Sequence, residues 1–329
     1  PTGLLTGRLV APAVREYGFE LRLCAHLEAP DRLVARQLGA AVHGRRIMDV
    51  VCVEPGPDFA ARAAITAETI PPRAIESDAG PGRAVPIREA FDCHPQTARE
   101  TVEAAVDAGF FERERRGGQP AVRQTARYPA DWVDRLVGVE CKPDLDRPGA
   151  LETQLLTDVE LGLFDAVVLA TASHVTGAHL NRLPAAVGVW EFDPESGSRE
   201  VVREPSPLAP AEPGVEILER GAARTAVQIV TADELARQRR RLAERAYGKG
   251  WRPRSLPACA RAEPDADGVP HCPWADRVVH PPTDCGPDCS GHEPADPPPV
   301  DRAARRAAAS PWEPDPPGRR RTQAGLDRF

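Results

Sequence analysis

Three segments between residues 135 and 171 decide how this chain folds: RLVGVECKPDL (135–145), LETQLLTDVELGLF (151–164) and DAVVLAT (165–171). Apolar residues alternate with other residues in the first segment and recur at helical spacing in the second. In the third segment they form a continuous run, which is typical of a buried strand. The sequence therefore predicts a strand, an amphipathic helix and a second strand, in that order.

Two charged residues, Glu140 and Lys142, lie near the end of the first predicted strand. Side chains two positions apart share one face of a strand, so this carboxylate and this ammonium face the same side. Lys142 is one of only two lysines in the chain, the other being Lys249. An ammonium is a compact charge with an adjustable pKa, which arginine does not offer. The pair is therefore either a chemical site or a simple ion pair at the end of a strand.

Composition limits the class of protein. The chain has 329 residues, is 41% apolar and carries a formal net charge of −7. It has no run of about 18 apolar residues and no signal-peptide pattern, so we expect a cytoplasmic protein without a membrane span. The acidic surplus and the preference for arginine resemble proteins of salt-loving archaea. In molar salt the Debye length falls to about 3 Å, so net negative charge does not exclude a nucleic-acid partner.

The segments before residue 60 read as two helices and a strand. Residues 17–28 place apolar side chains at helical spacing, with Glu20 on the neighbouring stripe. Residues 33–42 continue a helical pattern. Residues 46–53 read as a buried strand that ends at a Pro-Gly pair.

Asp49 is the one acid inside that predicted strand. A carboxylate in an apolar strand is costly unless it is paired or binds a metal. The sequence leaves two interpretations open: Asp49 is a metal ligand, or it accepts a hydrogen bond from the neighbouring Arg45 or Arg46.

Residues 86–129 read as a separate unit. A short helix at 86–91 and a longer helix after His94 precede two strand arms around Gly118. This order resembles a winged helix, in which one helix enters a groove and the ribbon reaches the phosphate backbone. The alternative is a small module that contacts protein. The candidate nucleic-acid-binding residues are Arg113, Arg115, Arg116, Arg123 and Arg127.

The second half of the chain carries fewer signals. A helix is predicted at 174–183, a hairpin from 187 to about 204, and a proline-rich linker at 205–214. Residues 231–248 form a predicted helix that opens with the capping-box pattern of Thr and Glu three residues apart. Beyond residue 251 we expect little regular structure, ending in a basic tail that is either solvated or contacts phosphate.

The order of predicted elements resembles the core of the PD-(D/E)XK nuclease superfamily. In that superfamily an acid on the second core strand and the E-x-K motif on the third hold Mg²⁺ or Mn²⁺. The resemblance implies that Asp49 and Glu140 bind the ion and that Lys142 assists the attacking water. Gln154 then takes the place of the Gln in the helix motif of RecB-like members, and Glu20 that of the acid on the first helix.

Three features depart from the superfamily pattern. Asp158 stands where RecB-like members place a Tyr, Glu16 and Glu28 compete with Glu20, and the gap between Asp49 and Glu140 is unusually long. An inserted module explains that gap. The whole chain also resembles an uncharacterised protein family of haloarchaea through residues 35–51, 110–118, 244–251 and the cysteine-rich end, a resemblance that implies no activity.

The eight cysteines divide into two groups. Four lie singly in apolar segments and read as small core residues: Cys24, Cys52, Cys93 and Cys141. Four cluster near the C-terminus with His271 and His292 nearby: Cys259, Cys272, Cys285 and Cys289. Four soft ligands in a cytosolic chain predict a structural metal rather than disulfides. Zn²⁺ is one choice. A [4Fe-4S] cluster, which the resemblance to RecB-like nucleases implies, is the other, with Cys24 as a possible substitute ligand. Unligated cysteines are the third.

The predicted organisation is an α/β nuclease-like core, built from residues 17–60 and 130–204, with an inserted winged-helix-like module at 61–129. A loose extension at 1–16, a linker and helix at 205–250, and a Cys/Pro-rich extension at 251–329 complete it. The absence of an initial Met indicates truncation or processing. We expect a metal-dependent deoxyribonuclease; the alternatives are a non-catalytic DNA-binding regulator and a protein-interaction scaffold.

Overall fold

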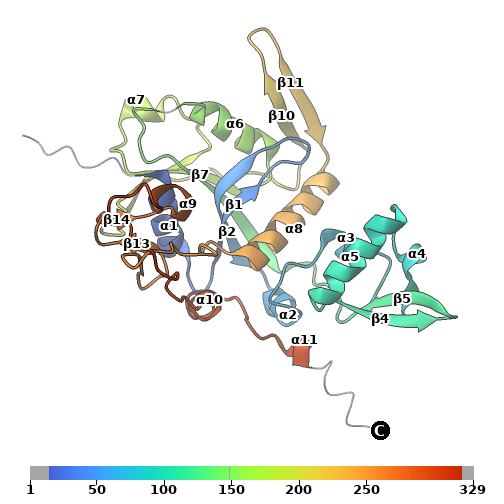
Figure 1. The fold of residues 1–329 in the computed structure, drawn as a ribbon. Coiled ribbons are helices and arrows are strands. Elements are labelled where there is room, and N and C mark those ends of the chain that lie inside the picture. Colours follow the sequence, from blue (N-terminus) through green and yellow to red (C-terminus); the bar gives the residue numbers. More distant parts are fainter. Residues whose placement is uncertain (1–14, 148, 321–329) are drawn as a thin grey trace, which may run out of the picture.

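The computed structural model describes residues 15–147 and 149–320, and its centre is a mixed sheet of six strands (Figure 1). The strands lie in the order β1-β2-β6-β7-β8-β9. Their bounds are β1 Leu33–Gly39, β2 Ile47–Pro55, β6 Val133–Cys141, β7 Ala166–Thr171, β8 Gly188–Phe192 and β9 Arg199–Arg203. The first three strands pair antiparallel, β7 and β8 continue parallel to β6, and β9 turns back antiparallel.

The predicted strand, helix and strand of residues 135–171 are confirmed as β6, α6 (Leu151–Leu161) and β7. Gly162 ends α6 in the left-handed conformation, with φ of 64°, which a glycine adopts without steric cost. Asp165 then fixes the start of β7, because its carboxylate accepts a hydrogen bond of 2.6 Å from the backbone N–H of Leu136 on β6. Arg239 donates to the same carboxylate at 2.8 Å.

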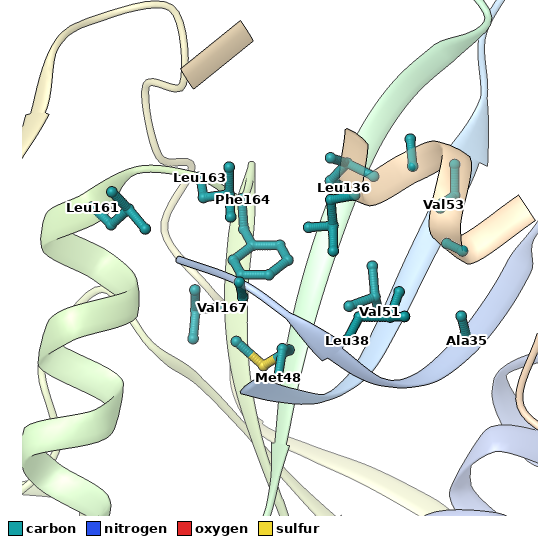
Figure 2. Close-up of a cluster of buried hydrophobic side chains, with 14 of the residues drawn as sticks. Ala35, Leu38, Met48, Val51, Val53, Leu136, Leu161, Leu163, Phe164 and Val167 are labelled. Carbon is teal, nitrogen blue, oxygen red and sulfur yellow. The ribbon is translucent and has the colours of Figure 1, made fainter. Parts of the chain in front are cut away.

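Two apolar layers cover the two faces of this sheet, because alternate residues of each strand face opposite sides. On β2, Val51 and Val53 face the larger layer, whereas Val50 and Cys52 face the smaller one. Helices α6 and α8 (Ala232–Lys249) close the larger layer, and α1 (Glu16–Leu27) closes the smaller one. Figure 2 shows part of the larger layer: Ala35, Leu38, Met48, Val51, Val53, Leu136, Leu161, Leu163, Phe164 and Val167.

Gly138 on β6 lets the larger layer close tightly. A Cβ at this position would lie 2.8 Å from the Cε atom of Met48 and 3.0 Å from the Phe164 ring. Both side chains pack against β6 in Figure 2. A residue larger than glycine would therefore displace two buried side chains.

The prediction of a helix at 33–42 is wrong, because this segment forms strand β1. Its residues Leu33, Val34 and Ala35 are all fully buried, and they pair with β2 in a continuous antiparallel register. The apolar residues of this segment are buried on both faces of the strand and also fit a helical spacing. Periodicity alone does not distinguish a helix from a strand in such a run.

Two further predictions in the second half need correction. The predicted helix at 174–183 is reduced to the single turn α7 (Gly177–Leu180). The predicted linker contains the start of an unforeseen hairpin, β10 (Gly214–Arg220) and β11 (Thr225–Val230), which projects from the body in Figure 1. The capping box at the start of α8 is confirmed, since the side chains of Thr231 and Glu234 each accept from the other's backbone N–H.

The segment of residues 59–124, between β2 and β6, has its own sheet of order β3-β5-β4 and its own apolar cluster, except that Phe59 and Ala63 pack in the larger layer of the central sheet. In Figure 1 it lies to one side of the central sheet. Its elements are α2 Phe59–Ala63, α3 Pro72–Ile75, β3 Val85–Pro86, α4 Ile87–Ala90, α5 Pro95–Asp107, β4 Phe111–Arg116 and β5 Gln119–Gln124. The two predicted helices and two strand arms are present, and β3 adds a third strand.

A buried ion pair joins this unit to α8. Arg62, from α2, donates to both carboxylate oxygens of Glu244 at 2.6 and 2.7 Å, and neither side chain is exposed. The backbone N–H of Ile70 and the hydroxyl of Tyr128 donate to the same carboxylate at 3.0 and 2.8 Å. Every donor comes from the segment between β2 and β6, so Glu244 fixes where this segment meets the core.

The region after residue 251 contains short elements only: β12 Glu263–Pro264, β13 Pro270–Cys272, β14 Arg277–Val278, α9 Pro281–Asp284, α10 Arg302–Ala309 and α11 Pro317–Arg320. It packs against α1, where the Tyr17 and His280 rings lie 4.3 Å apart. The predicted basic tail is not simply solvated, because Arg306 of α10 is buried and donates to the carbonyl of Ala246 at 3.1 Å. Of the predicted loose extension at 1–16, residues 1–14 lie outside the described residues, as does the end of the tail, 321–329, whereas Glu16 already begins α1.

No helix within the described ranges has both the length and the apolar character that crossing a bilayer requires.

Candidate active site

Two of the predicted site acids, Glu20 and Asp49, meet at one amide. The Nε2 atom of Gln37 on β1 donates to Glu20 Oε2 at 3.0 Å and to Asp49 Oδ1 at 3.1 Å. The other carboxylate oxygen of Asp49 accepts from the backbone N–H of Cys141 at 2.9 Å. Only 3% of Glu20 and 8% of Asp49 is exposed. Helix α1 and strand β2 thus bring their acids together below the surface.

Gln37 makes this contact in an unusual backbone conformation. Its φ is 53°, in the left-handed region, which costs a residue with a side chain about 1 kcal/mol or more. It lies between the paired positions Arg36–Val50 and Leu38–Met48 of the β1–β2 ladder. The two carboxylates that accept from its amide compensate for this strain.

The carboxylate oxygens of Glu16, Glu20 and Asp49 all lie within 4.8 Å of one another. Glu16 is the first residue of α1 and is exposed, so it forms the outer side of this group. Oxygen ligands at such spacing suit a hard divalent cation. Arg36 competes for one of them, since its Nε donates to Glu20 Oε2 at 2.6 Å.

Glu140 belongs to a second group held by Arg46. The Nη2 atom of Arg46 donates to Glu140 Oε2 at 2.6 Å and to Asp158 Oδ2 at 2.7 Å, and its Nε donates to Asp158 Oδ1 at 2.9 Å. Arg46 therefore joins β6 to α6. Asp49 accepts its hydrogen bonds from Gln37 and Cys141 and not from Arg46.

Electrostatic coupling links the two groups. Burial, followed by the negative charge of Asp49, raises the pKa of Glu140 to about 8 against the pull of Arg46. Burial also raises the pKa of Asp49 and takes that of Asp158 to about 6. Burial raises the pKa of Glu20 as well, and Asp49 adds to the effect. The carboxylates of this site are therefore under-compensated by their arginine partners.

Lys142 and Gln154 take no part in the hydrogen bonds of these acids. Lys142 continues the sheet, since its backbone N–H donates to the Ala170 carbonyl at 2.9 Å, and its side chain is partly buried. In the described part of the chain its ammonium has no ion-pair partner. Gln154 is partly buried on α6, one turn before Asp158. Asp158, which stands where RecB-like members place a Tyr, is the residue of α6 that binds Arg46.

The family of this protein follows from a comparison with family profiles, in which residues 33–294 match DUF5787. The chain belongs to the DUF5787 family, a family of unknown function. No curated protein and no solved structure matches it. The matched residues include the sheet, the inserted unit and the four C-terminal cysteines. The expectation of an uncharacterised family is thus confirmed, and the comparisons bring no activity with it.

The predicted nucleic-acid-binding arginines of this DUF5787 chain differ in their surroundings. Arg123 forms ion pairs with Glu112 and Glu114 of β4, so its charge is already compensated. Arg116 donates to the carbonyl of Ala84 at 3.2 Å. The other three arginines are exposed: Arg113, Arg115 and Arg127. The first two of them line a cavity of about 530 Å³ beside α5.

The C-terminal cysteines of the DUF5787 chain are close enough to interact. Burial, followed by the thiols of Cys259, Cys272 and Cys289 among its neighbours, raises the pKa of Cys285. The backbone N–H of Glu293 donates to Cys259 Sγ at 3.5 Å. All eight cysteines are free thiols. Within the described residues, no three of these four sulfurs lie within 4.8 Å of one another.

The other four cysteines follow the expectation of core residues with one exception. Cys24, Cys52 and Cys141 are buried in the smaller apolar layer, whereas Cys93 is only partly buried. Cys24 lies near Cys52, whose thiol contributes to raising its pKa.

Sequence reasoning missed Gln37, Arg46 and Asp158 as members of the site. Arg46 and Asp158 are separated by 112 positions, so only the fold brings them together. The sequence did contain a signal for both residues. Arg46 is an arginine beside a buried strand, and Asp158 is an acid on the apolar side of a predicted helix, so each is a charge that needs a partner.

Proposed function

We propose that this DUF5787 chain is a metal-dependent nuclease that hydrolyses DNA phosphodiesters. The element order α1, β1, β2, β6, α6, β7, with an antiparallel trio followed by a parallel strand, supports the resemblance to the PD-(D/E)XK core. The insertion between β2 and β6 accounts for the long gap between Asp49 and Glu140.

The observation that carries the proposal is the meeting of Glu20 and Asp49, from a helix and a strand, with Glu140 of the neighbouring strand close enough for its charge to interact with that of Asp49. Burying several carboxylates together is costly unless opposite charge compensates them. Burial raises the pKa of each of these carboxyl groups despite the opposing charges of Arg36 and Arg46. A divalent cation on oxygen ligands would do so.

Each residue then has a distinct role. Glu20 and Asp49, with Glu16 on the exposed side, would hold the cation. Glu140 would join them if Arg46 gave up its hydrogen bond to Glu140 and kept those to Asp158. A cation held by these residues would supply polarisation of a phosphoryl oxygen and a lower pKa for a bound water. Lys142, without an acidic partner in the described chain, stabilises the charge that develops on the phosphate.

A second function is favoured by the arginines. Arg36 and Arg46 already contact Glu20 and Glu140 at 2.6 Å. If these contacts persist in solution with metal present, the core is a degenerate nuclease. The protein is then a DNA-binding regulator that uses its winged-helix-like unit.

A cleavage assay separates the two functions. Purified protein is incubated with linear and branched DNA and with Mg²⁺ or Mn²⁺. Asp49→Asn and Lys142→Ala should each reduce cleavage about 100-fold or more. Asp134→Asn, which removes an exposed acid from the same strand β6, is the matched control and should cleave normally. Cleavage by both site variants at the wild-type rate contradicts the site assignment, and binding without cleavage supports the regulator.

DNA contact by the inserted unit has a test of its own. Arg113→Gln and Arg115→Gln remove exposed charges beside α5. Each should lower the slope of log affinity against log salt by about 1, as expected for a lost phosphate contact. An unchanged slope would assign this unit to protein contact instead.

The proposal includes a metal centre at Cys259, Cys272, Cys285 and Cys289. Four thiols suit a soft metal, and the N–H donated to Cys259 Sγ stabilises a thiolate. One zinc ion with bonds of about 2.3 Å would bring its sulfurs within about 3.8 Å of one another. A [4Fe-4S] cluster, whose thiolates attach to different irons, would hold the sulfurs farther apart. Metal analysis and a visible absorption spectrum distinguish iron–sulfur from zinc.

A further inference from the structure

A cavity of about 780 Å³ lies beside the candidate active site. Strand β1 and helix α8 form one wall, and the segment between β2 and β6 forms the other. The lining residues that matter here are Gln37, Gly39, Thr69, Arg245, Lys249 and Arg254. Three of these six are cations, and Lys249 is the second of the two lysines in the chain.

Backbone carbonyls of β1 hold two of the cations in place. Lys249 Nζ donates to the carbonyl of Gln37 at 2.7 Å, and Arg245 Nη2 donates to that of Gly39 at 2.7 Å. Arg254 is exposed at the edge of the cavity. Among the described residues, none of these three cations forms an ion pair with an acid.

The charges around Lys249 are positive. Its pKa is lowered by burial and then by Arg36, Arg254 and Arg245. The pKa of Arg245 is likewise lowered by burial and by Arg241. Each cation therefore repels its neighbours, and an anion in the cavity would remove that repulsion.

Two acids, Glu68 and Asp107, also line the cavity, and both lie on the wall formed by the segment between β2 and β6. Glu68 acts electrostatically on Arg306, and Asp107 is exposed at the end of α5. The cations all lie on or just after α8. The cavity thus has a cationic wall on the core side and an acidic wall on the other.

Gly248 allows α8 to come close enough to form this cavity. A Cβ at Gly248 would lie 2.0 Å from Thr69 Oγ1, so any other residue would push α8 away from that segment. The next residue, Lys249, is bound to the carbonyl of Gln37, whose side-chain amide binds Glu20 and Asp49. One residue therefore joins the cationic wall to the acidic site.

We propose that this cavity binds the phosphodiester backbone of a nucleic-acid strand. Phosphates lie against Lys249, Arg254 and the free N–H groups of Arg245, and the strand continues past Gln37 to the acids. The inference rests on the proposed nuclease function and names where its substrate is held. It assigns DNA contact to the core as well as to the inserted unit.

The test compares two double variants that remove equal charge. Lys249→Gln with Arg254→Gln changes the cavity, and Arg220→Gln with Arg224→Gln changes exposed arginines on the β10–β11 hairpin. Binding of a short labelled DNA is measured by fluorescence anisotropy, with EDTA, over a range of salt. The cavity variant should bind about tenfold more weakly, with a salt slope smaller by about 2, and the hairpin variant should match the wild type.

The combined results of the binding and cleavage assays distinguish this inference from the nuclease proposal. If the cavity variant binds DNA like the wild type and the wild type cleaves DNA with Mg²⁺, the cavity inference is wrong and the nuclease function stands. If the cavity variant binds weakly but the wild type does not cleave, the inference stands and the nuclease function is wrong. Inorganic pyrophosphate is the competitor: if it binds at the cavity while DNA does not, the ligand is a free phosphate compound and the inference is overturned.

Discussion

Glu140→Gln should make this protein more stable at neutral and alkaline pH, although it changes a residue that binds an arginine. The substitution keeps the shape of the side chain and removes a group that, in the folded protein, must either take up a proton or bear a buried charge. Arg46 retains two hydrogen bonds to Asp158, at 2.9 and 2.7 Å, so its own charge stays paired. The free energy of unfolding rises because the variant no longer pays for burying the carboxyl group of Glu140 or for its repulsion with Asp49.

The magnitude follows from the pKa of Glu140, which is about 8 in the folded protein against an ordinary value of 4.5. A carboxyl group whose pKa is raised by folding contributes stability below pH 4.5, and this contribution is lost as the pH rises through 8. Each pKa unit corresponds to about 1.4 kcal/mol. Between pH 5 and pH 8 the wild type should therefore lose about 3 kcal/mol of unfolding free energy that the variant keeps.

Urea unfolding, followed by tryptophan fluorescence in a chelator-containing buffer at several pH values, measures this difference. The stability of the variant relative to the wild type should rise with pH. Glu152→Gln, which removes an exposed glutamate from α6, is the control and should follow the wild type. A Glu140→Gln difference that stays constant from pH 5 to pH 8 would refute the reasoning, because it would mean that Glu140 is ionised throughout.

Three further predictions concern packing, the buried ion pair and the cysteines. Gly138→Ala should lower the unfolding free energy by about 1–3 kcal/mol in urea, because its Cβ would press on Phe164; an unchanged midpoint would show that the layer repacks. Glu244→Ala leaves the buried charge of Arg62 without a partner, so it should lower the free energy of unfolding by about 3–5 kcal/mol in the same assay. A decrease of less than about 1 kcal/mol would contradict a buried ion pair. In protein that carries the proposed iron–sulfur cluster, Cys285→Ser should lower the iron content, weaken the visible absorption and speed amide exchange after residue 251. Full metal content in this variant would exclude Cys285 as a ligand.

The sequence predicted the parts of the fold in which local pattern and tertiary burial agree. Strand β6, helix α6 and strand β7 have distinct periodicities, and the capping box marks the start of α8 by itself. Strand β1 was predicted as a helix because its residues are buried on both faces, and only pairing with β2 decides between the two. The β10–β11 hairpin was missed because β11 is almost wholly exposed and the buried residues of β10 are a glycine and a glutamate, Gly214 and Glu216, rather than an apolar stripe.

The sequence identified acids of the candidate site but not the residues that bind them. Asp49 and Glu140 could be selected because each is a charge inside an apolar strand. Asp158 was interpreted as a departure from the superfamily pattern, yet it is nearly fully buried and holds Arg46 from α6. The left-handed backbone of Gln37 has no sequence signal, since glycine is the residue that usually marks such a position.

The insertion between β2 and β6 has a consequence for how the chain assembles during synthesis. Val50 of β2 pairs with Val139 of β6, so the central sheet cannot close until the ribosome has passed residue 139. The intervening segment has its own apolar cluster and can become compact first, which brings its two ends together and lowers the entropy cost of that long-range pairing. Until then β2 presents an unpaired edge, and a nascent chain stalled at this stage is the one most prone to aggregate.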